Sequence, residues 1–329
     1  MKKKIVLSGM RPTGRLHLGN YFGAIVNWID LQERDDTDCF YFVADWHSLT
    51  TDYDSTGEIA GNIREMVVDW LACGIDPDKS TVFVQSAVKE HAELNLLLSM
   101  ITPLPWLERN PTYKEQLREQ ATRDLHTYGF LGYPVLQASD IIIYKGNLVP
   151  VGIDQVPHVE LTREIARRFN HFYGEVFPEP EAYLTETPKL LGIDNRKMSK
   201  SYGNALYLSD SDEELDRKVM EMVTDPQRKR RHDPGNPDVC NVFSFHKMFS
   251  TYEIVERVNR ECRTAEIGCV ECKKLMAEGL KRFIRPIRNK REEILIDDSL
   301  LKEIFEKGLE RARKIAQQTM KKVREAIGI

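Results

Sequence analysis

The stretch Asp194-Asn195-Arg196-Lys197-Met198-Ser199-Lys200-Ser201-Tyr202-Gly203-Asn204 is the most informative in this sequence. Lys197 and Lys200 stand three residues apart among small hydroxyl residues, and a glycine follows them. Two compact ammonium groups on such a segment can bring charge to one polyanion without a fixed fork geometry, which suits a departing pyrophosphate. An ordinary solvated basic loop fits the pentapeptide equally well. A second glycine-flanked segment, Gly14-Arg15-Leu16-His17-Leu18-Gly19-Asn20, favours the phosphate interpretation.

The overall composition is that of a soluble globular protein. The chain has 329 residues, of which 41% are hydrophobic and 30% charged, and it contains no run of 18 apolar residues. The apolar stretch near the N-terminus is too short for a signal peptide, so we expect a cytoplasmic protein with no membrane partner and about two domains.

Charge does not by itself reveal a nucleic-acid partner. The net charge is −4, although a local basic patch is sufficient to contact a phosphate backbone. The candidates are Arg228-Lys229-Arg230-Arg231 and a basic C-terminal helix carrying Arg311, Arg313, Lys314, Lys321, Lys322 and Arg324. Each is also compatible with a simple solvated face.

Hydrophobic periodicity predicts an α/β first half and a helical second half. Strands are expected at residues 5–7, 39–44, 81–84 and near 149–151, and helices at 21–31, 59–73, 93–101, 134–144 and 159–169. Strands alternating with helices indicate a Rossmann-like parallel sheet with its ligand at the carboxyl ends of the strands. Further helices are expected at 212–224, 242–263, 272–293 and 300–327.

We therefore expect three parts in the chain. Residues 1–185 would form the Rossmann-like catalytic domain, 186–208 a mobile lysine loop and linker, and 209–329 an all-helical domain. The C-terminal helix is expected either to stay with the helical domain or to pack back on the first domain.

The first strand ends in residues suited to nucleotide binding. Neither a Gly-x-x-x-x-Gly-Lys-Ser/Thr loop nor a Gly-x-Gly-x-x-Gly turn is present, so phosphate must be bound in another way. Gly19 would let a flat adenine lie against the backbone, and the helix that starts there offers a positive dipole end. A histidine such as His17 at a helix start is often purely structural.

Taken together, the segments Ser8–Asn20 and Lys197–Ser201 resemble the His-x-Gly-His and Lys-Met-Ser-Lys-Ser signatures of class I aminoacyl-tRNA synthetases. The resemblance implies that His17 steadies the α-phosphate of ATP and that Lys197 and Lys200 draw out the β- and γ-phosphates. It also implies ATP contacts from Arg11, Pro12, Thr13, Gly19, Asn20, Gly152, Ile153, Asp154, Leu190, Met198, Ser199 and Ser201. Lys114 would assist pyrophosphate and Mg²⁺. Asn20 replaces the second histidine of the signature, and Arg11 replaces the usual glutamine.

Asp154 and Gln155 follow a glycine at the end of a predicted strand. A carboxylate beside Gly152 can accept both ribose hydroxyls, but Asp154 could instead cap the helix expected from residue 159. The resemblance makes Gln155 a ligand of the amino-acid substrate.

Gly132-Tyr133-Pro134-Val135-Leu136-Gln137-Ala138-Ser139-Asp140-Ile141 is expected to choose that amino acid. Gln137 and Asp140 share a helical face, and the segment resembles the Tyr-Pro-x-Leu-x-Ala-x-Asp run of the tryptophanyl members of the family. There the aspartate accepts a hydrogen bond from the indole N–H, for which a buried carboxylate is a good partner. Tyr133 and Gln155 would hold the α-amino and carboxylate groups, with Leu7 and His47 nearby.

The resemblance implies ATP-dependent attachment of L-tryptophan to tRNA through an adenylate, in a homodimer whose interface includes residues 103–144. The alternatives are a tyrosyl enzyme, a nucleotidyltransferase that does not act on tRNA, and a non-catalytic RNA-binding protein. Tyrosyl enzymes carry a tyrosine on the first strand where this chain has Leu7 and Ser8.

Four of the six cysteines, Cys240, Cys262, Cys269 and Cys272, form a Cys-x21-Cys-x6-Cys-x2-Cys pattern. Four thiolates can bind either Zn²⁺ or a [4Fe-4S] cluster. Three close cysteines with one distant partner resemble the pattern of some bacterial tryptophanyl enzymes that carry an iron–sulfur cluster, so we expect a cluster, with zinc or unligated thiols as alternatives. The position of these cysteines in the helical half indicates a role near the anticodon-reading surface.

Overall fold

The computed structural model describes residues 3–111, 113–114, 124–184 and 190–329. The chain divides into two compact units. The first unit consists of residues 1–14, 23–187 and 297–329, and the second of residues 15–22 and 188–296. The predicted boundary at 185–186 lies outside the described residues. The C-terminal segment belongs to the first unit, and the short segment around His17 belongs to the second.

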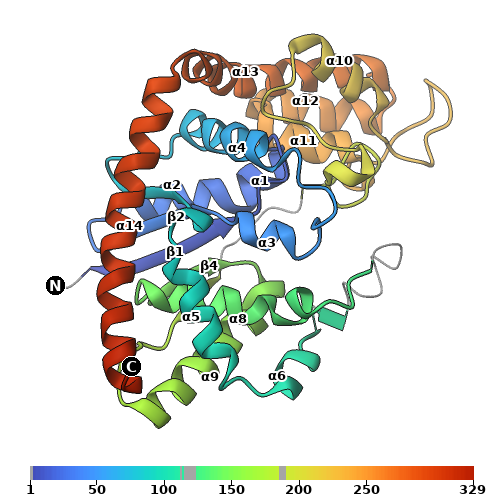
Figure 1. Ribbon diagram of the computed structural model, residues 1–329. Helices are drawn as coiled ribbons and strands as arrows, with labels where there is room; N and C mark the ends of the chain where they lie inside the picture. Colours follow the sequence, from blue (N-terminus) through green and yellow to red (C-terminus); the bar gives the residue numbers. More distant parts are fainter. Residues whose placement is uncertain (1–2, 112, 115–123, 185–189) are drawn as a thin grey trace. The chain divides into compact units, whose positions relative to one another are not determined.

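A five-stranded parallel sheet forms the centre of the first unit (Figure 1). Its strands are β1 (Lys4–Met10), β2 (Thr37–Val43), β3 (Ser80–Val84), β4 (Leu148–Val151) and β5 (Glu181–Leu184), in the spatial order β3-β2-β1-β4-β5. Val6 of β1 pairs with Cys39 of β2 on one side and with Leu148 of β4 on the other. The connections therefore reverse direction between β1 and β4, and such a switch point opens a crevice at the carboxyl ends of the strands.

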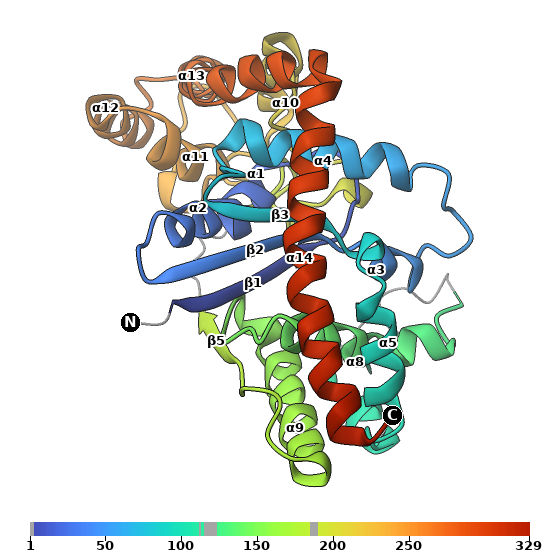
Figure 2. The same cartoon turned by 60° about the vertical axis from the view of Figure 1, so that its left-hand side comes forward.

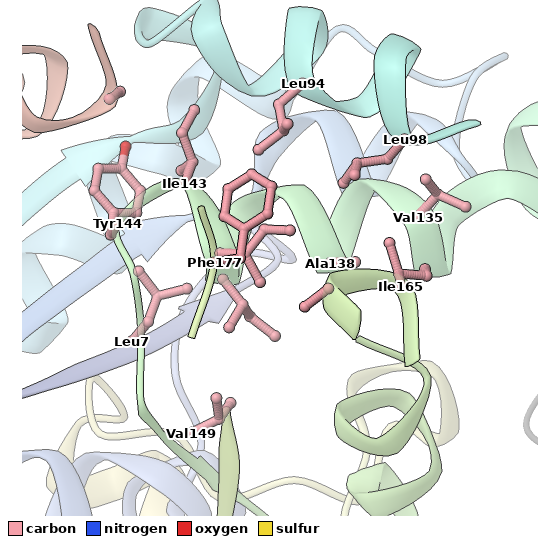
Figure 3. Close-up of a cluster of buried hydrophobic side chains, with 14 of the residues drawn as sticks. Leu7, Leu94, Leu98, Val135, Ala138, Ile143, Tyr144, Val149, Ile165 and Phe177 are labelled. Atoms are coloured by element: carbon pink, nitrogen blue, oxygen red, sulfur yellow. The ribbon is translucent and has the colours of Figure 1, made fainter. Parts of the chain in front are cut away.

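Three helices, α5 (Glu90–Ser99), α8 (Tyr128–Ile143) and α9 (Val156–Tyr173), pack their apolar faces against one side of this sheet (Figure 3). The other helices of the first unit are α2 (Val26–Gln32), α3 (Asp45–Leu49), α4 (Ile59–Cys73), α6 (Leu104–Glu108) and α14 (Asp298–Ile327). Figure 3 shows Leu94 and Leu98 of α5, Val135 of α8 and Ile165 of α9 gathered in one cluster of buried side chains. This packing fixes α8, which carries the segment expected to choose the amino acid.

Helix α14 lies against β3, at the edge of the sheet (Figure 2). A Cβ on Gly308 would stand only 1.8 Å from the carbonyl oxygen of Val82, so the close approach requires glycine at this position. The Arg311 guanidinium adds hydrogen bonds to Thr81 (2.7 Å) and Asp38 (2.7 and 2.8 Å). The last helix of the chain is thus part of the α/β unit.

The second unit is built from helices. They are α1 (Leu18–Asn20), α10 (Asp212–Glu221), α11 (Asn241–Phe249), α12 (Tyr252–Arg263) and α13 (Cys269–Ile296). Phe22, Phe249 and Phe283 pack ring against ring with centroids 5.2 to 5.9 Å apart. These contacts attach residues 15–22 to the helical unit. None of the described helices combines the length and apolarity needed to cross a membrane.

Several predicted elements are confirmed and others differ for identifiable reasons. Helix α4 has the predicted bounds, and Gly74 ends it with φ of 115°, a conformation natural to glycine. The single helix predicted over 242–263 is wrong, because Ser250 is extended (ψ 158°) and divides it into α11 and α12. The helix predicted over 21–31 begins with a π-helical turn, Tyr21–Ile25, at the junction of the units. Strand β5 was not predicted, since its four residues show no apolar alternation.

Candidate active site

A cavity of about 350 Å³ lies at the switch point of the sheet in the first unit. Its volume falls in the range of roughly 300 to 1,000 Å³ that is usual for small-molecule sites. The ends of β1, β2 and β4 and one face of α8 form its walls. All six residues predicted to bind tryptophan line it, together with two of the predicted ATP contacts: Leu7, His47, Tyr133, Gln137, Asp140, Gln155, Arg11 and Gly152.

Asp140 is the most heavily hydrogen-bonded group of the cavity and is only 1% exposed. Its Oδ1 accepts from Gln85 Nε2 (2.8 Å) and bonds His91 Nδ1 (2.6 Å), while Oδ2 bonds His47 Nε2 (2.8 Å) and Gln85 Nε2 (2.9 Å). Burial acts to raise the pKa of Asp140, but the hydrogen bonds and charges of His47 and His91 outweigh it and hold the pKa below its usual range. The carboxyl group is therefore ionised at neutral pH.

Tyr133 and His158 form a second buried pair in the cavity wall. The Tyr133 hydroxyl lies 2.7 Å from His158 Nε2. Burial lowers the pKa of His158 to about 4, so its ring is neutral at pH 7. Burial also raises the pKa of Tyr133 to about 12, against a smaller opposite effect of the Arg11 charge. The phenol thus stays protonated and can both donate and accept hydrogen bonds.

Gly152 makes room for the Asp154 carboxylate at the end of β4. A Cβ on Gly152 would lie 2.7 Å from Asp154 Oδ1. Asp154 is exposed and its Oδ2 accepts from Gln155 Nε2 (3.1 Å). The alternative role as a helix cap is not realised, because Gln155 is the N-cap of α9 and that helix has no side-chain cap. The carboxylate is thus available to an external ligand.

His17 caps the short helix α1 in the second unit. Its Nδ1 accepts from the Asn20 backbone N–H (3.2 Å), while Asn20 Oδ1 accepts from the His17 N–H (3.2 Å). Burial lowers the pKa of His17 to about 4, so the ring is neutral. Because Nδ1 is the acceptor, the remaining ring proton is on Nε2, which leaves a neutral N–H donor for a ligand.

The lysine loop is held by one buried side chain, Asn204. Its Oδ1 accepts from the Ser199 N–H (2.8 Å), and its Nδ2 donates to Asp194 (2.7 Å) and to the Lys197 carbonyl (3.1 Å). Met198 is buried, whereas Lys197 and Lys200 are exposed. The loop thus has an ordered base, and its two lysine residues are exposed.

The His17 segment and the lysine loop lie together within the second unit. The Leu18 N–H donates to the Leu206 carbonyl (2.9 Å), and His17 forms a β-bridge with Tyr207. A Cβ on Gly19 would stand 3.6 Å from Met198 Cβ. The two motifs that the sequence separates by nearly the length of a domain are thus neighbours in space.

Other predicted residues do not line the cavity. Besides Asp154 and the residues of the His17 segment and the lysine loop described above, they are Lys114, which is exposed, and Pro12, Thr13, Ile153 and Leu190. The prediction missed Gln85, His91 and His158, although each makes a hydrogen bond to a predicted tryptophan ligand. No spacing rule links these residues to Asp140 or Tyr133 along the chain, so only the fold reveals them.

The four cysteines gather in the second unit, where α11, α12 and α13 begin or end. Burial raises the pKa of Cys272 to about 12, with further contributions from Cys240, Cys262 and Cys269. Arg228 Nη1 lies 3.7 Å from Cys262 Sγ. Among the described residues, no group of three or more His, Cys, Asp or Glu side chains is arranged to hold a metal ion.

The family description "tRNA synthetases class I (W and Y)" matches residues 1–285. Tryptophan–tRNA ligase of Thermotoga maritima is 54% identical over 98% of this chain and 99% of its own, and that of Aquifex aeolicus is 48% identical over 98% and 99%. A structure of tryptophanyl-tRNA synthetase from Campylobacter jejuni complexed with ADP and tryptophan superposes with a TM-score of 0.90, at 36% identity over 99% of this chain and all of that one.

The fold and these matches define an aminoacyl-tRNA ligase of class I, as the sequence predicts. Within that class, the identity and the full-length coverage are decisive. The chain belongs to the tryptophan–tRNA ligase family.

Proposed function

We propose that this chain activates L-tryptophan with ATP and transfers it to tRNA. In the first step a carboxylate oxygen of tryptophan attacks the α-phosphorus of ATP, and the bond to pyrophosphate breaks. A ribose hydroxyl at the tRNA end then attacks the acyl carbon of the adenylate and AMP leaves. No protein nucleophile is needed, because the substrate carboxylate is already ionised. The observation that carries this proposal is the buried, ionised Asp140 in a cavity of amino-acid size.

Tryptophan would lie in the cavity with its indole N–H on Asp140. A carboxylate buried among aromatic and aliphatic side chains suits a substrate that offers one donor and no acceptor. Tyr133 and Gln155 would hold the α-amino and carboxylate groups, with Gln137 and Leu7 against the side chain. Phenylalanine has no N–H to offer Asp140, and sites built around such a hydrogen bond reject the analogue that lacks it by about 10⁴ to 10⁵.

A neutral N–H donor and two lysine charges would bind the phosphates of ATP. The Nε2–H of His17 would steady the α-phosphate, and Lys197 and Lys200 would follow the negative charge as pyrophosphate departs with Mg²⁺. Asp154 would accept the ribose hydroxyls. Contacts to ATP from Arg11 to Thr13, Gly19, Asn20, Gly152, Ile153, Leu190, Met198, Ser199 and Ser201, and a pyrophosphate contact from Lys114, are part of the same proposal.

A homodimer is supported by apolar side chains left exposed in the first unit. Leu96 (56%), Met100 (70%), Leu104 (57%) and Tyr128 (76%) lie along α5, the start of α6 and the start of α8. These side chains belong to or adjoin the region predicted to form the interface, and exposed apolar surface is typical of such contacts. Part of the predicted interface, residues 112 and 115–123, lies outside the described residues. The tRNA is expected on the basic surfaces of the second unit.

The four cysteines are proposed to hold a [4Fe-4S] cluster, with Zn²⁺ as the alternative. The donor set fits such a group chemically, since neighbouring thiols raise one another's pKa, and this mutual repulsion is removed when the thiolates bind iron or zinc. Cys240, Cys262, Cys269 and Cys272 would be the ligands, and Arg228 would donate to Cys262. The group would brace the helices of the second unit. Anaerobically purified protein should be brown; colourless protein with stoichiometric zinc would favour the alternative.

Amino-acid-dependent exchange of pyrophosphate into ATP, measured with each of the twenty amino acids, tests the proposed function. Tryptophan should support exchange and tyrosine should not. Exchange with tyrosine alone would assign the chain to the tyrosyl enzymes, and exchange with none would contradict an activating function.

A further inference from the structure

Both oxygens of the Asp140 carboxylate already accept hydrogen bonds inside the protein. His91 donates to Oδ1, His47 donates to Oδ2, and the one nitrogen of Gln85 lies between the two oxygens. Asp140 is also only 1% exposed. An indole N–H can therefore come within hydrogen-bond distance of this carboxylate only where one of these donors moves away.

Two of the three donor residues are held at both ends. His91 is 0% exposed, and its other ring nitrogen lies 2.7 Å from the Tyr144 hydroxyl. Gln85 is also 0% exposed, and its Oε1 accepts from the Trp46 backbone N–H (3.1 Å). Neither residue lines the cavity. Moving either one would leave a second buried polar group without a partner, which is costly.

His47 differs from both in the features that matter for displacement. It comes from the short helix α3 (Asp45–Leu49), its side chain is 12% exposed, and it lines the cavity. Among the described residues it is the one donor to Asp140 that a ligand entering the cavity can touch.

We propose that His47 is a displaceable placeholder, which occupies Asp140 Oδ2 in the free protein and yields it to the indole N–H when tryptophan binds. The inference rests on the proposed function and adds a specificity role for His47. The indole N–H of tryptophan replaces the broken His47–Asp140 hydrogen bond with a new one. A side chain without a donor cannot, so His47 keeps its place and blocks the floor of the cavity.

The direct test follows the imidazole Nε2–H of His47 by ¹H–¹⁵N NMR of the wild-type protein, with His47→Gln to assign the signal. Saturating tryptophan should move this signal or expose it to solvent exchange, and the same concentration of phenylalanine should leave it in place. A signal unchanged in the tryptophan-saturated protein would overturn the inference.

Affinity provides an independent check. Removal of the competitor in His47→Ala should tighten tryptophan binding by about three- to tenfold in calorimetry. His47→Gln keeps an N–H donor near the same place and should not show this gain in affinity. Weaker binding by His47→Ala would also overturn the inference. If wild-type protein neither binds tryptophan nor supports exchange with it, the proposed function fails instead.

Discussion

The cavity around Asp140 and the loop around Lys197 prepare for their ligands in opposite ways. Asp140 is 1% exposed and its hydrogen bonds come from residues 49 to 93 positions away. The lysine loop is organised locally by Asn204, five to ten positions from its partners, and Lys197 and Lys200 are exposed. A rigid buried site suits the recognition of a fixed shape, whereas exposed flexible charges suit a phosphate group that moves. Each region should therefore fail in its own way.

The largest effect is expected in the lysine loop. Lys197→Ala or Lys200→Ala should lower the rate of adenylate formation by about 10²-fold or more, because charge developing on pyrophosphate loses its counterion. Tryptophan affinity should stay near wild type. Rapid-quench measurement with saturating substrates gives the rate. Arg196→Ala is the matched control, since this loop cation is already paired with Asp194 (2.6 Å); a similar loss there would mean that the loop acts by its fold alone.

Substitution of Asp140 should instead weaken tryptophan binding while leaving the rate of adenylate formation nearly unchanged. In Asp140→Asn the buried charge disappears and its donors lose a partner, so tryptophan affinity should fall by about 10- to 150-fold, as for hydrogen bonds to charged groups. The adenylation rate at saturating tryptophan should change much less. Equilibrium dialysis with a single-turnover assay separates the two quantities. A collapse of the rate with unchanged affinity would exchange the roles assigned to the two regions.

Asn204→Ala tests whether the loop needs its buried anchor. Loss of three hydrogen bonds at the base of the loop should reduce the adenylation rate by about 10-fold, less than loss of a lysine, because the charges remain and only their position is relaxed. Asn195→Ala alters an exposed asparagine of the same loop and serves as a control. This substitution is expected to strain the backbone slightly, because Asn195 has φ of 67°. A loop that worked equally well without Asn204 would argue against pre-organisation.

The smallest expected effect is on the pH dependence of the free energy of unfolding. A buried histidine in each of the two units should contribute to it. His158 and His17 have pKa values lowered to about 4 by burial. The unfolded chain, with ordinary histidine pKa near 6.5, binds more protons between pH 6.5 and 4, so stability falls as the pH drops through that range. Each residue contributes a slope of up to about 1.4 kcal/mol per pH unit. Urea unfolding of His158→Gln at pH 7, 6 and 5 should show a shallower decline than wild type.

Local signals in the sequence identify the elements and the motifs but not the long-range partners. The positions of four strands, the stop at Gly74 and the family are confirmed, because glycine conformation and short apolar runs are encoded locally. The bounds of the strands differ from the prediction, most of all for β1, which spans Lys4–Met10 where residues 5–7 were expected. Gln85 and His91 were not predicted, since their hydrogen bonds to Asp140 form only after β3, α5 and α8 have packed together. The break at Ser250 was missed for a related reason: helical periodicity continues across it. The roles assigned to the site residues remain predictions.

The division of the chain also lay beyond local patterns. Residues 15–22 follow the first strand directly, yet their aromatic contacts attach them to the helical unit. The C-terminal helix is joined to the α/β unit by Gly308 and Arg311. Both attachments depend on partners more than 200 positions away, which no window of sequence contains.

Recognition of the indole N–H by the buried Asp140 carboxylate can be tested with an amino acid that lacks this N–H. Pyrophosphate exchange should be measured with tryptophan and with benzothienylalanine, an isosteric amino acid whose sulfur replaces the N–H. We expect kcat/KM for the analogue to be lower by about 10²-fold or more, because its sulfur has no hydrogen atom to donate to Asp140. Equal kcat/KM for the two amino acids would contradict it.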